Sequence, residues 1–117
     1  MSTDTRPTRD DARSILAHTA ALLAHASDLT WSEVRTDPSP QKRFLGLGLD
    51  LAACEAARLL PSGLDVDVPG ADALATNVQE LVRAAEGCLR LLPIEQFPPG
   101  TSQLVVDICD LIQESAP

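Results

Sequence analysis

The stretch RFLGLGLDLAACEAARLL, residues 43–60, decides the fold, because it fits a strand, a nucleotide-binding loop or a helix. Its leucines alternate from Leu45 to Leu51 with the period of a half-buried strand. Gly46 and Gly48 match the start of a G-x-G-x-x-G loop, but Leu51 stands where the third glycine belongs, and no strand precedes it. The alanine-rich second half favours a helix.

The residues that flank this stretch decide for the helix. Ser39 followed by Pro40 is a good N-cap and first-turn pair, and Pro61 closes the segment. A strand of that length would be abnormal, whereas a helix of about six turns is ordinary. Under the helical period the segment has two apolar seams, so we predict a central helix buried on two sides. One seam is Phe44, Leu47, Leu51, Cys54 and Arg58; the other is Gly46, Leu49, Ala53, Ala56 and Leu60.

Apolar residues at helical spacing predict three further main helices. The first covers about 8–28 and the third about 71–92, with Glu86 and Arg90 as an i,i+4 ion pair on its polar side. The fourth helix is capped by Thr101 or Ser102. Its buried face is predicted to comprise Leu104, Val105, Ile108, Leu111 and Ile112.

The remaining segments complete the predicted architecture. A capping box from Thr30 to Glu33 predicts a short helical piece around Trp31. Residues 1–7 are polar and are predicted to be a flexible tail, and 8–116 a single domain. The predicted fold is therefore all-α: an antiparallel bundle of four main helices plus one short helical segment.

Composition argues against several classes of function. The chain has a formal net charge of −8, and its nine basic residues are spread along the sequence, which disfavours nucleic-acid binding. It contains no apolar run of about 18 residues, so no membrane span is expected. Its three cysteines form no C-x-x-C pair, which disfavours a disulfide framework or a zinc site. We therefore expect a cytoplasmic protein without a metal or cofactor. One lysine against eight arginines favours a GC-rich bacterial genome.

The cysteines and one acidic loop are possible metal ligands by residue type. Cys54, Cys88 and Cys109 fall on or beside apolar helix faces and are predicted to be small core residues. The segment from Asp65 to Gly70 imitates the start of a calcium loop, but Thr76 stands where the bidentate glutamate belongs. Neither pattern predicts a metal site.

His18 and His25 are the first candidates for chemistry. Seven residues apart, they stack along one edge of the first helix with a rise of about 10 Å between them, too far to share one metal ion. An acidic bundle of this size with a helical histidine resembles the histidine-phosphotransfer domains. Their H-x-L-K-G motif is matched by the histidine alone in HTAAL, from His18, and in HASDL, from His25. The resemblance implies a phosphoryl-accepting imidazole at one of these positions.

Arg13 and His18 carry a second resemblance. RSILAH satisfies the R-x(4–6)-H pattern of HEPN-type ribonucleases, which are also helical bundles. That resemblance implies an RNA substrate, which the net charge of −8 disfavours.

We therefore predict a non-enzymatic interaction or regulatory module that binds a protein partner or a second copy of itself, with a homodimer favoured. The alternatives are a phosphotransfer module using His18 or His25, and a ligand binder or enzyme with its site in the bundle core. Small residues let two helices approach closely, so the second seam of the central helix is the candidate dimer interface, with packing inside the monomer as the alternative. This candidate interface comprises Gly46, Leu49, Ala53, Ala56 and Leu60.

Overall fold

The protein is a bundle of helices, seen here in a computed structural model that describes residues 9–60 and 77–115. Over these two ranges the chain forms helices and no strand. The predicted tail at 1–7 lies outside the described residues. The elements are α1 (Arg9–Thr36), α2 (Pro40–Arg58), α3 (Val78–Leu89), the 3₁₀-helix η1 (Ile94–Gln96) and α4 (Thr101–Glu114).

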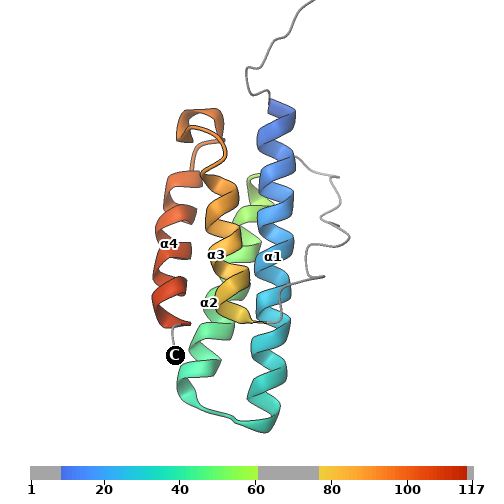
Figure 1. Cartoon of the computed structure of the whole chain (residues 1–117), viewed down its shortest axis with the longest axis vertical. Helices are drawn as coiled ribbons and strands as arrows, with labels where there is room; N and C mark the ends of the chain where they lie inside the picture. Colours follow the sequence, from blue (N-terminus) through green and yellow to red (C-terminus); the bar gives the residue numbers. More distant parts are fainter. Residues whose placement is uncertain (1–8, 61–76, 116–117) are drawn as a thin grey trace, which may run out of the picture.

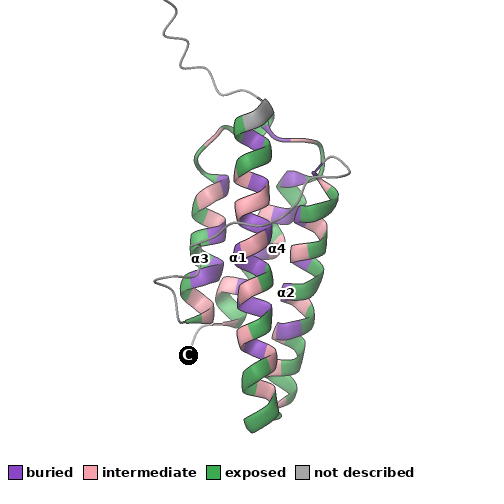
Figure 2. Cartoon of the chain, turned by 90° about the vertical axis from the view of Figure 1, so that its right-hand side faces the viewer, coloured by how far each residue is buried: buried purple, intermediate pink, exposed green. Residues whose placement is uncertain are grey.

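The four α-helices stand at the corners of a square. α1 packs against α2 and α3, and α4 packs against the same two helices from the far side. α1 and α4 are therefore diagonal to one another, as are α2 and α3 (Figure 1, Figure 2). In Figure 1 the chain runs down α1, up α2, up α3 and down α4, so each packed pair is antiparallel. The predicted antiparallel bundle of four main helices is confirmed.

The first helix is longer than predicted. α1 spans 28 residues and runs on through Trp31, so the predicted short piece is the last part of α1. The Thr30 hydroxyl donates to the backbone oxygen of Ala26, one turn back, at 2.9 Å. It therefore serves the helix interior and does not cap a new helix. Outside the four α-helices, the described short helical element is η1.

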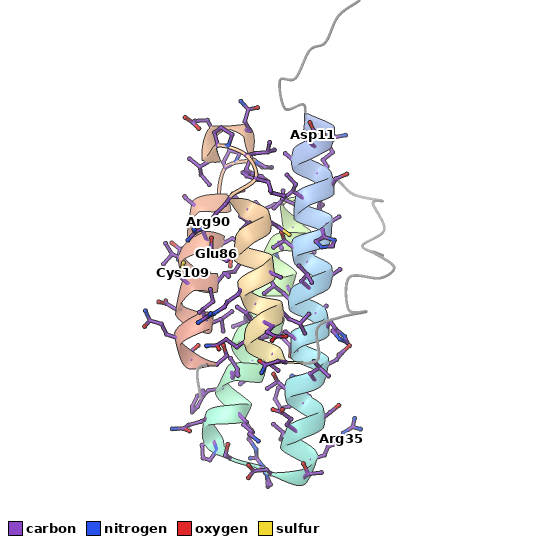
Figure 3. The ribbon with its side chains drawn as sticks, viewed as in Figure 1. Asp11, Arg35, Glu86, Arg90 and Cys109 are labelled. Atoms are coloured by element: carbon purple, nitrogen blue, oxygen red, sulfur yellow. The ribbon has the colours of Figure 1, made fainter. Side chains whose placement is uncertain are left out.

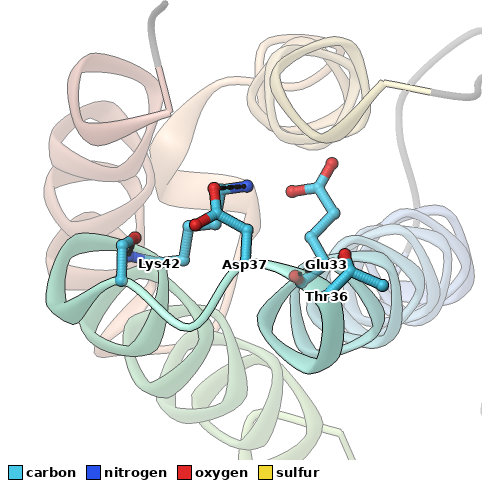
Figure 4. Close-up of polar contacts among 5 residues, drawn as sticks. Glu33, Thr36, Asp37 and Lys42 are labelled. Carbon is cyan, nitrogen blue, oxygen red and sulfur yellow. Dashed lines mark hydrogen bonds and ion pairs between the residues drawn. The ribbon is translucent and has the colours of Figure 1, made fainter.

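The start of α2 follows the sequence prediction. Pro40 is the first helical residue, and the Ser39 side chain accepts from the backbone N–H of Lys42 at 3.2 Å. The turn before it is closed by the Asp37 N–H, which donates to the backbone oxygen of Glu33 at 2.8 Å. The Lys42 ammonium lies 3.1 Å from the Asp37 carboxylate across this turn (Figure 4). These contacts return the chain along α1 as an antiparallel neighbour.

α3 begins later than predicted within the described residues. The Asn77 backbone is extended, and its side-chain oxygen accepts from the backbone N–H groups of Gln79 and Glu80 at 2.8 and 3.4 Å. An N-cap of this kind marks the first turn of a helix. The part of the predicted helix at 71–76 lies outside the described residues. The predicted ion pair between Glu86 and Arg90 is present (Figure 3).

The cap of α4 differs from the prediction. Gly100 precedes the helix with a φ of 100°, in the left-handed region that favours glycine. Thr101 is buried and is the first helical residue, and its hydroxyl donates to the backbone oxygen of Pro98 at 2.8 Å. The connection from η1 therefore turns on a glycine, and neither Thr101 nor Ser102 is the N-cap.

The core is aliphatic, as the scarcity of aromatic residues requires. The residues of α1 at helical spacing on its inner face are all buried or half-buried, and they are Ala12, Ile15, Leu16, Thr19, Leu22, Leu23, Ala26 and Leu29. The hydroxyl of Thr19, one of these residues, donates to the backbone oxygen of Ile15 at 2.7 Å, so its burial leaves no polar group unsatisfied. The largest fully buried apolar side chains are Leu16, Leu23, Leu49, Leu81, Val82, Leu104 and Ile108.

α1 and α2 approach each other closely where Trp31 lies over Gly46. A Cβ atom placed on Gly46 would lie 2.7 Å from Cε2 of the indole ring, which is closer than carbon atoms pack. The indole Nε1–H donates to Oδ2 of Asp50 at 3.1 Å, and the Ser27 hydroxyl donates to Oδ1 of the same carboxylate. Gly46 thus admits the ring, and Asp50 holds it in place.

We expect Gly46→Ala to destabilise the protein. Overpacking costs about 1–3 kcal/mol, and the better helix propensity of alanine offsets about 1 kcal/mol of that cost, so we expect a net loss of about 1 kcal/mol. The matched control is Gly87→Ala in α3, where a Cβ atom meets nothing within 4 Å. The control should gain up to about 1 kcal/mol. Urea unfolding measures the free energy of unfolding of both variants. An equal gain in this free energy for Gly46→Ala and Gly87→Ala would contradict the prediction that the indole ring leaves no room for a side chain at position 46.

Candidate functional site

The seam that the sequence analysis offered as a dimer interface is buried inside the chain. Leu49 and Ala56 are fully buried, Leu60 is 9% exposed, Gly46 is buried and Ala53 is half-buried. α1 covers Gly46 directly, through the indole ring of Trp31. This small-residue seam therefore packs within the monomer, which is the alternative to a dimer interface. A second copy would have to bind another face.

The opposite seam of α2 is exposed, which corrects the prediction that the helix is buried on two sides. Phe44 is 70% exposed, Leu47 51% and Leu51 71%, and Cys54 and Arg58 are exposed as well. The reason is the square arrangement: among the described helices, α1 and α4 are the main packing neighbours of α2, and they lie against the half of its surface that faces the core. We call the three large apolar residues Phe44, Leu47 and Leu51 the outer stripe.

A shallow hollow lies at the N-terminal end of the outer stripe. Its volume is about 270 Å³, and its α2 lining consists of four residues at i, i+3, i+4 and i+7. Such a set forms the hole that receives a side chain of a facing helix in knobs-into-holes packing. Pro38 completes the lining, and the four α2 residues are Pro40, Arg43, Phe44 and Leu47.

An acidic groove lies at the other end of the stripe, between α2 and α4. It has a volume of about 300 Å³ and brings Glu55 of α2 together with Asp107, Asp110 and Glu114 of α4. The described residues contain no group of three or more histidine, cysteine or acidic side chains arranged to hold a metal ion. The apolar lining of the acidic groove consists of Gly48, Leu51, Ala52 and Leu111.

Glu55 and Asp107 form a carboxyl pair in this groove. Burial raises the pKa of Glu55 above its ordinary value of 4.5, and the hydrogen bond with Asp107 and the charge of Asp107 raise it further, while Arg58 opposes the shift. This pair is not apparent from the sequence, because the two residues lie on helices far apart in the chain. The groove is therefore a place where protonation and packing are linked.

We expect Glu55→Gln to reduce the dependence of stability on pH. Because folding raises the pKa of Glu55, the folded state is more stable relative to the unfolded state when Glu55 is protonated. This contribution of Glu55 to stability is complete below pH 4.5 and is lost as the pH rises through the pKa of the folded state. The variant should therefore melt at a higher temperature than wild type at pH 7, with the difference narrowing towards pH 4.5. Glu33→Gln, on an exposed residue, is the charge-matched control. The same pH profile in both variants would contradict the prediction.

The histidine candidates occupy positions of intermediate exposure. His18 and His25 are both half-buried, and neither lines the hollow beside Phe44, the acidic groove or the hollow that Arg13 lines. Phosphotransfer needs an accessible imidazole beside a cation, so these surroundings give it no specific support. It stays a prediction.

Arg13 and His18 are not brought together. Five residues apart on one helix, they point about 140° away from each other around its axis. Arg13 instead lines a hollow of about 410 Å³ at the end of the bundle, with Leu59 and residues 95–99. That hollow opens at the surface, outside the aliphatic core. The arrangement therefore offers no common site for the ribonuclease pattern.

The three cysteines differ from one another, which corrects their prediction as core residues. Cys54 and Cys109 are exposed, and only Cys88 is half-buried. Cys54 belongs to the exposed seam of α2, and Cys109 points outward from α4 (Figure 3). Burial raises the pKa of the Cys88 thiol, an effect that its hydrogen bond with Thr19 partly opposes.

We expect a thiol reagent such as Ellman's reagent to label two cysteines quickly in the native protein and the third only after denaturation. Cys54 and Cys109 are accessible, whereas Cys88 is shielded and holds its proton more tightly. The variant Cys54→Ser, Cys109→Ser should show no fast phase. A fast phase in that variant would contradict the assignment.

Comparisons of the chain with protein-family models, with curated proteins and with solved structures found no match. Over the residues described, no helix combines the length and apolar character that crossing a bilayer requires. Fold and surface together define a four-helix bundle protein that exposes the three large apolar residues of the outer stripe on one face of α2.

Proposed function

We propose that the protein is a non-enzymatic interaction module that binds another protein surface through the outer stripe of α2. The observation that carries this proposal is the exposure of Phe44, Leu47 and Leu51 on one helical face. Single apolar residues are common on protein surfaces, but three large ones in a row on a helix are typical of a helix-binding surface. The hollow at one end of the stripe and the acidic groove at the other give the surface both shape and charge.

We also propose that the module is cytoplasmic. All three cysteines are free thiols, and two of them are exposed, which suits a reducing compartment. An acidic surface favours solubility and disfavours nucleic acid as the partner. The partner is therefore a protein, either another chain or a second copy of this one.

Photo-cross-linking in the cell tests this function whatever the identity of the partner. Benzoylphenylalanine replaces Phe44, so an aromatic side chain stays in place, and the control carries it at Val106, which is 53% exposed on α4. We expect ultraviolet light to give a discrete product from position 44 and none from position 106. The mass of that product separates a second copy from a different protein.

Two outcomes would overturn the proposal. One is no cross-link from position 44 in cells where the protein is folded and abundant. The other is the same set of products from both positions, which would show that position 44 has only the contacts of any exposed surface.

A further inference from the structure

Resting on the proposed function, we propose that the outer stripe binds a second copy of this chain, with two α2 helices antiparallel around a two-fold axis level with Leu47. A two-fold pair requires a self-complementary surface, so that each half of the stripe fits the other half. The stripe meets this condition twice, once through its shape and once through its charge.

The shape argument starts from the hollow. Pro40, Arg43, Phe44 and Leu47 form a four-residue hole, and Leu51 is the exposed apolar side chain nearest the other end of the stripe. The hole is centred between residues 43 and 44. In an antiparallel pair with the two-fold axis close to position 47, residue 51 of one copy lies opposite residues 43 and 44 of the other. Leu51 of one copy therefore enters the hole of the other copy as a knob. Each copy therefore supplies one hole and one knob, and the two Leu47 side chains meet on the axis.

The charge argument uses the same register. Arg43 and Asp50 are seven residues apart, so they lie on one flank of the stripe, about two turns from each other. With the axis at Leu47, Arg43 of one copy faces position 51 of the other copy, within about two residues of Asp50. Arg43 is exposed and makes no ion pair with the described residues, whereas Lys42 already pairs with Asp37. Asp50 is exposed, and its carboxylate oxygens can accept from the guanidinium as well as from Ser27 and Trp31, so two symmetric ion pairs would flank the leucines.

A parallel pair lacks this complementarity. In that arrangement each residue faces its own level, so Leu51 meets Leu51 and the hole receives no knob. Arg43 would then face the uncharged flank that holds Phe44 and Gly48. The antiparallel orientation is therefore the one that uses the hollow and the Arg43 guanidinium together.

Sedimentation velocity of the purified full chain over a range of concentrations tests self-association. We expect reversible dimerisation in wild type, and a loss of at least about tenfold in the association constant for Leu47→Asp and for Arg43→Glu. Arg35→Glu is the matched control, because it makes the same change in net charge at an exposed arginine of α1 that points away from the bundle (Figure 3). It should dimerise within about twofold of wild type. Circular dichroism verifies that each variant is folded.

Cross-linking with a short bismaleimide tests the orientation. In the antiparallel pair the two Cys54 positions are about fourteen residues apart along the paired helices, or about 21 Å, whereas two cysteines at position 47 adjoin. Leu47→Cys, combined with Cys54→Ser and Cys109→Ser, should cross-link to twice the chain mass. Cys109→Ser alone, which keeps Cys54, should not. The reverse pattern would overturn the antiparallel register.

The outcomes separate this inference from the proposed function. If the wild type stays monomeric at every concentration, the proposal of a second copy as the partner is wrong. A cross-link from position 44 to a different protein would still support the proposed interaction function. Equal weakening by Arg43→Glu and Arg35→Glu would show that only net charge matters and would overturn the specific ion pair.

Discussion

The contact of the Trp31 indole with Gly46 fixes the rotation of α2, and the rest of the structure depends on it. A helix turns by about 100° per residue, so the face opposite a fixed contact is fixed as well. With Gly46 under the ring and Asp50 hydrogen-bonded to Ser27 and Trp31, Leu49, Ala52 and Ala56 turn into the core. Phe44, Leu47 and Leu51 then lie on the side of α2 that points away from the core, and they are exposed there because none of the described helices covers that side. This close approach, which a side chain on Gly46 would obstruct, thus sets which seam of α2 points into the bundle and which points away from it.

Local signals in the sequence predict the helices well and their limits less well. Ser39 and Pro40 identify the start of α2 because a cap needs only neighbouring atoms. Thr30 misleads, because the same hydroxyl that can cap a helix can also donate to the carbonyl one turn earlier. The two-sided burial of α2 could not be judged from its pattern, since an apolar seam looks the same whether a neighbouring helix covers it or not. How many neighbours a helix has is a property of the whole bundle.

The surface features were beyond local reasoning for the same reason. Glu55 and Asp107 become a pair only when α2 and α4 pack side by side, and the acidic groove is invisible in either helix alone. The outer stripe did carry a signal: Phe44, Leu47 and Leu51 follow the helical period together with Cys54 and Arg58. An arginine at the end of an apolar seam is costly to bury, so Arg58 was the residue that could have indicated an exposed face.

The charge of the chain bears on what kind of pair the outer stripe can form. Two copies with a net charge of −8 repel each other, and a single helical face buries less area than most stable dimers do. A proposed interface of this kind is therefore weak and reversible, and the ion pairs at its flanks contribute orientation more than affinity. Salt screens the long-range repulsion between the copies more than it screens a pair in direct contact beside the leucines. Association through the outer stripe should thus strengthen at moderate ionic strength, a dependence opposite to that of an interface held mainly by complementary charge.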